Sequence, residues 1–79
     1  MNLHINLFLK QARHKKGLSI RELAKVSGVG KASIERIEAE KTTPRIDTLC
    51  KLAKALDVPV TELFRYECDG EEISPENRD

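Results

Sequence analysis

The fold is decided by residues 20–39, which read IRELAKVSGVGKASIERIEA. Apolar residues recur at helical spacing on both sides of Gly28, which predicts two short helices joined by a tight turn. Ala24 is small enough to let the second helix pack closely on the first, and Gly28 tolerates the positive φ that such a turn requires. The residues expected to lock the two helices together are Val29, Ile34 and Ile37.

Helical patterns continue on both sides of this stretch and predict an all-α domain of five helices. Ile5, Phe8, Leu9 and Ala12 have the spacing of one helix face, and Gly17 after two lysines ends that helix. Ser19 then starts the next helix, with Glu22 completing a capping box. A fourth helix is expected over residues 46–56, with Ile46 on its apolar face and Cys50 as a core thiol, and a short fifth helix over residues 60–66.

Charged residues are unevenly distributed along the chain of 79 residues. Residues 1–66 carry 13 Lys/Arg against 7 Asp/Glu, whereas residues 67–79 carry one arginine against six acids. The first part is basic, as expected of a domain that binds a polyanion. We therefore expect one basic domain over residues 1–66 and a short, flexible, acidic tail over residues 67–79.

Several classes of protein fit this sequence poorly. Cys50 and Cys68 lack metal-ligand spacing, and we expect neither a metal site nor a cofactor. There is no phosphate-cradling glycine loop and no supported nucleophile–base pair, so an enzyme is not expected. No apolar run is long enough to cross a membrane, and the first residues do not resemble a signal peptide, which favours the cytoplasm.

The chain from about Ile5 to Phe64 resembles the lambda-repressor-like family of phage repressors, Cro proteins and XRE-type bacterial regulators. The matching motifs are Gly17-Leu18-Ser19, Glu22-Leu23-Ala24, Ser27-Gly28-Val29, the run Ser33-Ile34-Glu35-Arg36-Ile37-Glu38, Lys41 through Pro44, and Leu52-Ala53-Lys54-Ala55-Leu56. The resemblance implies a compact five-helix domain whose helix-turn-helix binds double-stranded DNA. It also implies a bacterial or phage-encoded transcriptional regulator, a repressor or controller, that acts as a homodimer on a pseudo-palindromic operator.

The resemblance assigns two sets of DNA contacts. Side chains of the helix after Gly30 would contact base edges in the major groove, and hydroxyls, cations and backbone amides around it would hold phosphates. The expected base-reading residues are Lys31, Ala32, Glu35 and Arg36. The expected phosphate-binding residues are Ser19, Arg21, Gly30, Ser33, Lys41, Thr42, Thr43 and Arg45. For Glu35, a base contact and an ion pair with Lys31 at i,i+4 remain equally open.

The family pattern also predicts a structural ion pair and a dimer interface. Arg13 and Glu38 match a buried pair that fixes the angle at which the reading helix is presented. The expected dimer interface is the apolar cluster near the C-terminus, which consists of Val58, Val60, Phe64 and Tyr66. Leu3 and Leu7 fall outside the expected core face, and they either cap the core or form part of a dimer seam.

The chain departs from the family pattern in two places. Ile20 and Arg21 stand where the family often has glutamine at the start of the second helix, and Glu40 stands where glycine is favoured. These departures keep two alternatives open. One is an antitoxin or restriction-modification controller with a protein partner, and the other is a protein-interaction module that no longer reads an operator.

Overall fold

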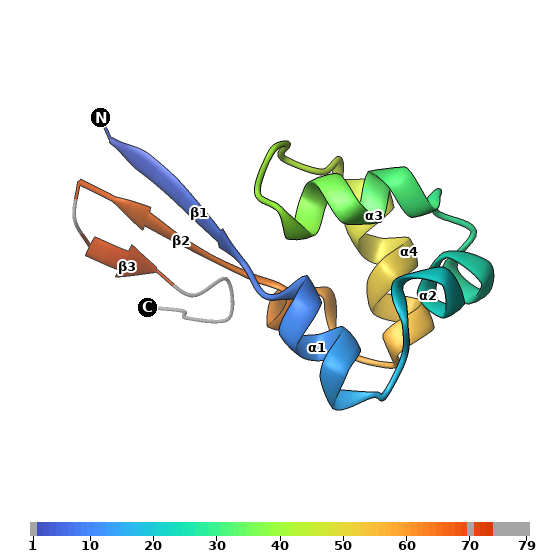
Figure 1. Cartoon of the computed structure of the whole chain (residues 1–79). Helices are drawn as coiled ribbons and strands as arrows, with labels where there is room; N and C mark the ends of the chain where they lie inside the picture. The colour runs from blue at the N-terminus through green and yellow to red at the C-terminus, as the bar shows by residue number, and fades with distance from the viewer. Residues whose placement is uncertain (1, 70, 74–79) are drawn as a thin grey trace.

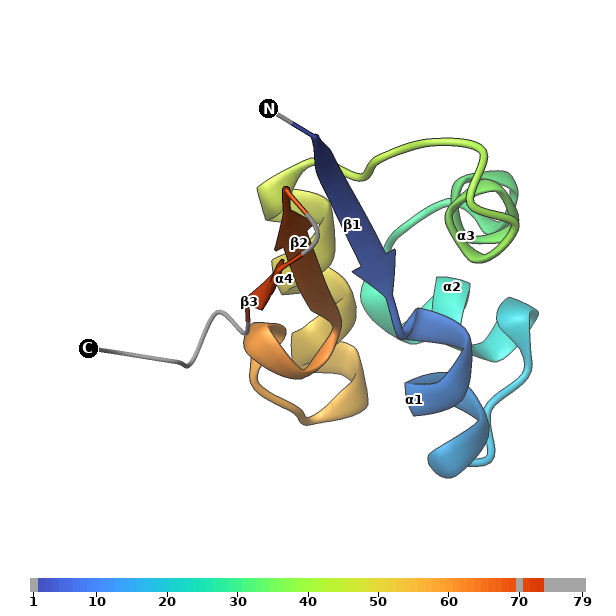
Figure 2. The same ribbon diagram turned by 90° about the vertical axis from the view of Figure 1, so that its left-hand side faces the viewer.

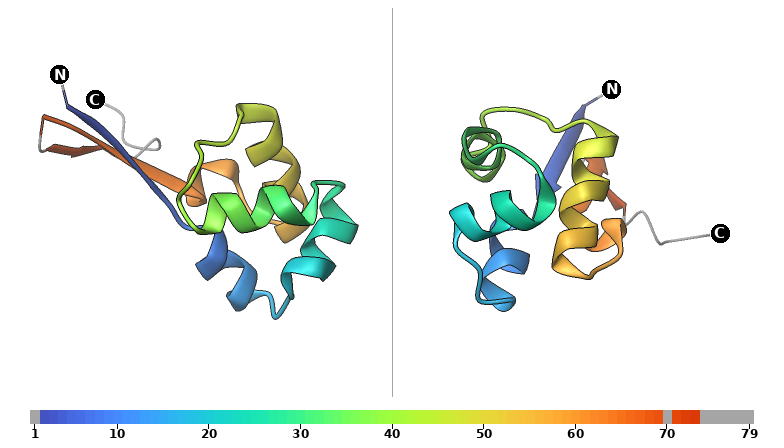
Figure 3. Two further views of the ribbon diagram at one scale, coloured as in Figure 1. Left: turned by 45° about the horizontal axis from the view of Figure 1, so that its top comes forward. Right: turned by 90° about the vertical axis from the view of Figure 1, so that its right-hand side faces the viewer.

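The computed structural model describes residues 2–69 and 71–73, the last three through their backbone (Figure 1). Four α-helices form the body of the molecule, and a three-stranded antiparallel sheet projects from it as an arm (Figures 1 and 3). In chain order the elements are β1 (Leu3–Leu7), α1 (Leu9–Lys15), α2 (Ile20–Ser27), α3 (Lys31–Glu38), α4 (Ile46–Leu56), the 3-10 turn η1 (Val60–Glu62), β2 (Phe64–Cys68) and β3 (Glu71–Ile73).

The strand β1 corrects the prediction that the first helix starts near Ile5 and that the fold is all-α. In β1, apolar and polar residues alternate, and the strand pairs antiparallel with β2 so that Leu7 lies opposite Phe64. The helix begins only at Leu9, after the Phe8 N–H has donated a hydrogen bond to the carbonyl of Leu63 at 2.9 Å. The alternation of residues 3–7 fits a strand, whereas the spacing of Ile5 with Phe8 and Leu9 fits a helix, and the partner strand at the far end of the chain decides between them.

The predicted fifth helix is also wrong. Only residues Val60–Glu62 form a helical turn, and the chain then enters β2. Aromatic residues such as Phe64 and Tyr66 fit a strand well, and pairing with β1 satisfies their backbone groups. The domain boundary expected after Tyr66 falls inside β2, and Glu71–Ile73 of the expected tail form β3. Residues 74–79 of that tail lie outside the described residues.

The local signals around α2 are confirmed. The Ser19 side chain accepts a hydrogen bond from the Glu22 N–H at 3.0 Å, and the Glu22 carboxylate accepts one from the Ser19 N–H at 2.8 Å. The Ser19 N–H lowers the pKa of Glu22, because a hydrogen bond to the carboxylate favours its charged form. At the other end of α2, Gly28 adopts φ 75° and its N–H bonds to the carbonyl of Ala24. The capping box and the left-handed glycine therefore set both ends of this helix.

The core lies where α2, α3 and α4 meet, and it is closed by α1 and η1 (Figure 2). Most of the predicted apolar faces point into it, but the face of α4 is narrower than predicted. Ile46 is 70% exposed and the Cys50 thiol is exposed, which corrects the expectation that this cysteine lies in the core. The buried apolar residues are Leu9, Leu23, Val29, Ile34, Ile37, Leu49, Leu52, Ala53, Leu56 and Leu63.

The predicted ion pair between Arg13 and Glu38 is confirmed. Two nitrogens of the guanidinium donate to the two carboxylate oxygens at 2.7 and 2.9 Å, and a third donates to the carbonyl of Leu18 at 2.9 Å. The side chains are only 8% and 7% exposed. The hydrogen bond to Glu38 raises the pKa of Arg13, which keeps the guanidinium charged. This bidentate pair connects α1 to the end of α3.

We predict that Arg13→Met destabilises the fold by about 3 kcal/mol, because it leaves the Glu38 carboxylate buried without its partner. The double variant Arg13→Met, Glu38→Leu should recover most of this loss, since it removes both charges. Urea unfolding followed by circular dichroism measures all three proteins. Equal loss in the single and double variants would contradict this account of the pair.

Backbone conformation gives a matched pair of predictions at Gly28 and Glu40, with φ 75° and 58°. Gly28→Ala should destabilise the fold by roughly 1–2 kcal/mol through left-handed backbone strain alone, since an added Cβ would meet no atom within 4 Å. Glu40→Gly should stabilise it by about 0.5–1 kcal/mol, because strain is relieved while chain entropy is lost. Thermal unfolding measures both, and a destabilised Glu40→Gly variant would show that the Glu40 side chain itself stabilises the loop.

Candidate nucleic-acid interface

The helix α3 presents one polar face to solvent. Its inner side is anchored by Ile34 and Ile37, which are 0% and 2% exposed. Because these residues are three apart, they lie on one face of the helix, and the opposite face is turned outward. The four predicted base-reading residues and Ser33 are all exposed on α3, and they are Lys31, Ala32, Ser33, Glu35 and Arg36.

On this face, two charged side chains are paired with each other and a third is not. Lys31 and Glu35 form an i,i+4 pair with 3.9 Å between Nζ and Oε2, and both side chains are about half exposed, at 53% and 51%. Such an exposed pair contributes little to stability and is easily exchanged for another partner. Among the described residues, the Arg36 side chain has no hydrogen bond or ion pair, so its five donors are available on the outer surface.

The loop after α3 turns sharply and returns beside that helix. Glu40 adopts φ 58°. The Glu40 N–H donates to the carbonyl of Ile37, and the Lys41 N–H donates to the carbonyl of Arg36, each at 3.0 Å. This is the Schellman arrangement, in which glycine is preferred at the left-handed position. The glutamate noted as a departure from the family pattern therefore adopts the backbone conformation that the family pattern implies.

The loop brings part of the predicted phosphate-binding set beside Arg36, which is the one predicted base-reading residue in the groove that they share. Ser33 and Arg36 of α3 and Thr42, Thr43 and Arg45 of the loop line one shallow groove of about 230 Å³. Arg45 is highly exposed and pairs with Asp47 at 3.3 Å. Two guanidiniums and several hydroxyls on one exposed surface form an arrangement suited to phosphate oxygens and base edges.

The start of α2 contributes less than the sequence suggested. Ser19 and Arg21 are exposed there, but the Ser19 hydroxyl and the Glu22 carboxylate already satisfy each other's backbone N–H groups. Ile20, which replaces the family's glutamine, is partly buried and packs against the core. Arg21 is therefore the charged group that this end of α2 offers to an anion.

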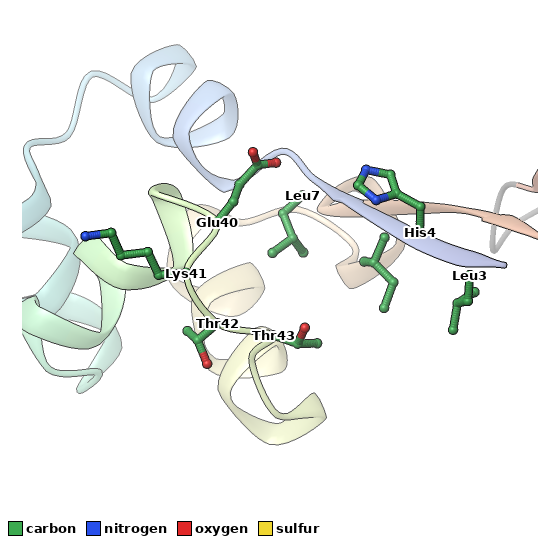
Figure 4. A pocket seen from close by; sticks show the side chains of 8 residues that line it. Leu3, His4, Leu7, Glu40, Lys41, Thr42 and Thr43 are labelled. Atoms are coloured by element: carbon green, nitrogen blue, oxygen red, sulfur yellow. The ribbon is translucent and has the colours of Figure 1, made fainter.

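A second groove escaped the sequence analysis (Figure 4). It has a volume of about 690 Å³ and lies between β1 and the loop at Glu40–Thr43. Leu3 and Leu7 point into it in Figure 4, whereas His4 points to the other side of the strand. Leu3 and Ile5 are 61% and 36% exposed. The signal was the alternation of residues 3–7, which a helical interpretation of Ile5 concealed.

The residues predicted for dimerisation are divided between two places. Val58, Val60 and Phe64 are partly buried and pack against the monomer's own core. Tyr66 lies in β2, where it is paired with Ile5 of β1.

In the part of the chain that the structure describes, no three His, Cys, Asp or Glu residues gather as metal ligands would. No helix among these residues has the length and apolar character needed to cross a membrane.

Comparison with known proteins agrees with this geometry. A sequence profile described as helix-turn-helix matches residues 9–63. The HTH-type transcriptional regulator SutR of Escherichia coli is 43% identical over 51 residues, which cover 65% of this chain and 29% of SutR. The HTH-type transcriptional regulator SinR of Bacillus subtilis is 43% identical over 57 residues, covering 71% of this chain and 51% of SinR.

The matched segment spans α1 to the end of η1, and so includes α2, the Gly28 turn, α3 and the loop after it. The chain spans only about a third to a half of these relatives, for example 30% of PuuR of Escherichia coli, which is 39% identical over 56 residues. The strands β1 and β2 lie outside the profile match. From the profile match and the geometry of α2 and α3, this chain belongs to the helix-turn-helix family of the XRE type, whose relatives here are HTH-type transcriptional regulators.

Proposed function

We propose that this protein is a transcriptional regulator that binds a specific DNA sequence through α3. The observation that carries the proposal is the exposed face of α3, where Arg36 is unpaired among the described residues and lies in one groove with the loop hydroxyls. Its opposite side is buried, so the helix presents this face in one orientation. A helix anchored in this way is suited to the major groove of B-DNA.

Each exposed residue of α3 has a role in this proposal. Arg36 donates to O6 and N7 of guanine, and the Ala32 methyl contacts a thymine methyl. Lys31 reaches either a base or a phosphate, and Glu35 accepts from cytosine N4 or remains with Lys31, as the observed pair allows. Each good bidentate contact contributes roughly 1–3 kcal/mol to discrimination between base pairs.

The surrounding groups hold the sugar-phosphate backbone. The basic and hydroxyl side chains of the loop lie beside α3, and the backbone amide of Gly30 and the Ser33 hydroxyl lie at its start. Their contacts position the protein without reading sequence. The proposed phosphate-binding residues are Ser19, Arg21, Gly30, Ser33, Lys41, Thr42, Thr43 and Arg45.

We propose further that the protein acts as a homodimer on a pseudo-palindromic operator. A two-fold dimer would place two α3 helices in successive major grooves, about 34–36 Å apart. Repression or control would follow where such an operator overlaps a promoter. The names of the relatives, which are transcriptional regulators, support a regulatory role.

The first prediction for this function concerns Arg36. Selection from a random DNA pool should recover a defined half-site, and Arg36→Ala should lower affinity for it by about tenfold or more. Lys54→Ala is the matched control, because Lys54 is an exposed cation near the end of α4, away from the groove. Fluorescence anisotropy measures all three proteins. If no sequence is enriched above random DNA, the proposal fails and the protein-interaction module is favoured.

The second prediction separates phosphate contacts from base contacts. Lys41→Ala should weaken binding to every sequence alike, because Lys41 is exposed in the loop and would contact phosphate. It should reduce the slope of log K against log salt concentration by about one. Binding isotherms at several salt concentrations provide the measurement. A change in sequence preference with an unchanged salt slope would assign Lys41 to base reading instead.

A further inference from the structure

The outer edge of β1 has no partner strand among the described residues. The sheet order places β2 on one side of β1 and no described strand on the other. Just beyond the two ends of β1, the Asp69 N–H donates to the carbonyl of Asn2 at 2.8 Å, and the Phe8 N–H donates to the carbonyl of Leu63 at 2.9 Å. Hydrogen-bonded pairs alternate along an antiparallel ladder. The even residues of β1 therefore bond to β2, and the backbone groups of Leu3, Ile5 and Leu7 face the open edge.

The same three residues carry the exposed apolar side chains of the arm. Side chains alternate between the faces of a strand, so Leu3, Ile5 and Leu7 share one face of the sheet. Tyr66 and Phe64, which are paired with Ile5 and Leu7, lie on that face too. Toward the tip this face is uncovered, since Leu3 is 61% exposed and Ile5 36% exposed. Exposed edges with apolar side chains readily pair with another strand.

The sequence of β1 is complementary to itself. Leu3-His4-Ile5-Asn6-Leu7 has the same pattern in both directions around Ile5, and it carries no formal charge with histidine neutral. Two antiparallel copies centred on Ile5 would place leucine opposite leucine, isoleucine opposite isoleucine, and His4 opposite Asn6. No like charges would meet, whereas the other edge strand, β3, contains two glutamates in three residues.

We propose that β1 pairs with β1 of a second copy, around a two-fold axis at Ile5, to form a continuous six-stranded sheet. The apolar side chains of the partner's strand would enter the groove beside β1 (Figure 4), with the partner's Leu3 next to Leu7. The far wall of that groove includes Glu40 and Lys41, one charge of each sign, which suits an uncharged strand.

This pairing would form the homodimer that the proposed function requires. The pairing itself is argued from the strand edge, and only its biological role rests on the proposed function. The groove beside β1 is lined by the loop but by none of the residues of α3. The proposed base-reading residues of α3 therefore stay open when the edge is paired. The partner's strand would lie beside three of the proposed phosphate-binding residues, Lys41, Thr42 and Thr43. The pairing is isologous, since the same strand meets itself, and it gives a closed dimer rather than a chain of molecules.

Sedimentation of the DNA-free protein over a range of concentrations tests the pairing. We expect a dimer, and Ile5→Lys should raise its dissociation constant by at least about tenfold, because two ammonium groups would meet at the axis. Val26→Lys is the matched control, since Val26 is 60% exposed on α2, away from the arm. Circular dichroism verifies that both variants are folded. A monomer at every concentration, or equal effects of the two variants, would overturn the pairing.

A disulfide tests the register independently of stability. In a Cys50→Ser, Cys68→Ser background, Ile5→Cys should cross-link two copies on mild oxidation, because directly opposite residues in a hydrogen-bonded pair have Cα atoms about 5.5 Å apart. His4→Cys should not, because its direct partner is residue 6. Absence of the Ile5→Cys dimer would refute the register. A folded monomer that still binds a defined half-site would refute the pairing alone, and a cross-linked dimer without DNA binding would refute only the proposed function.

Discussion

The burial of Ile34 and Ile37 fixes the rotation of α3 about its own axis, and this rotation decides which side chains the helix presents to solvent. The left-handed turn at Gly28 delivers the chain to the start of α3, and the two isoleucines then hold its inner side against the core. Because a helix is rigid, two buried anchors determine the direction of every other side chain along it. Arg36 and Lys31 are exposed as a consequence of this packing rather than through their charge alone.

The ion pair between Arg13 and Glu38 extends this constraint to the rest of the molecule. It connects α1 to the end of α3, and α1 follows β1 after a single residue. A bidentate contact between nearly buried charges thus ties the end of α3 to the helix that follows the sheet arm. Removing one partner of such a pair is strongly destabilising, because the other charge is left buried without compensation.

Local signals along the chain were sufficient for the helical body. The capping box at Ser19, the left-handed turn at Gly28, and the apolar faces around Leu23, Ile34 and Leu52 involve residues a few positions apart, and all are present. The candidate DNA contacts were expected from the family resemblance, and local signals supplied the helix and the turn on which most of them lie. The pairing of Arg13 with Glu38 came from a family resemblance, because no local pattern connects residues so far apart.

The sequence by itself determined α2, the turn, α3 and the basic character of the surface around them, because helices, caps and turns depend on neighbouring residues. The tertiary structure alone decided that residues 3–7 and 64–68 are strands. Each segment is short and compatible with a helix, and only pairing between the two ends of the chain satisfies their backbone groups as a sheet. The exposure of Cys50 and Ile46 was likewise decided by where the core ends, which depends on every element packed around α4.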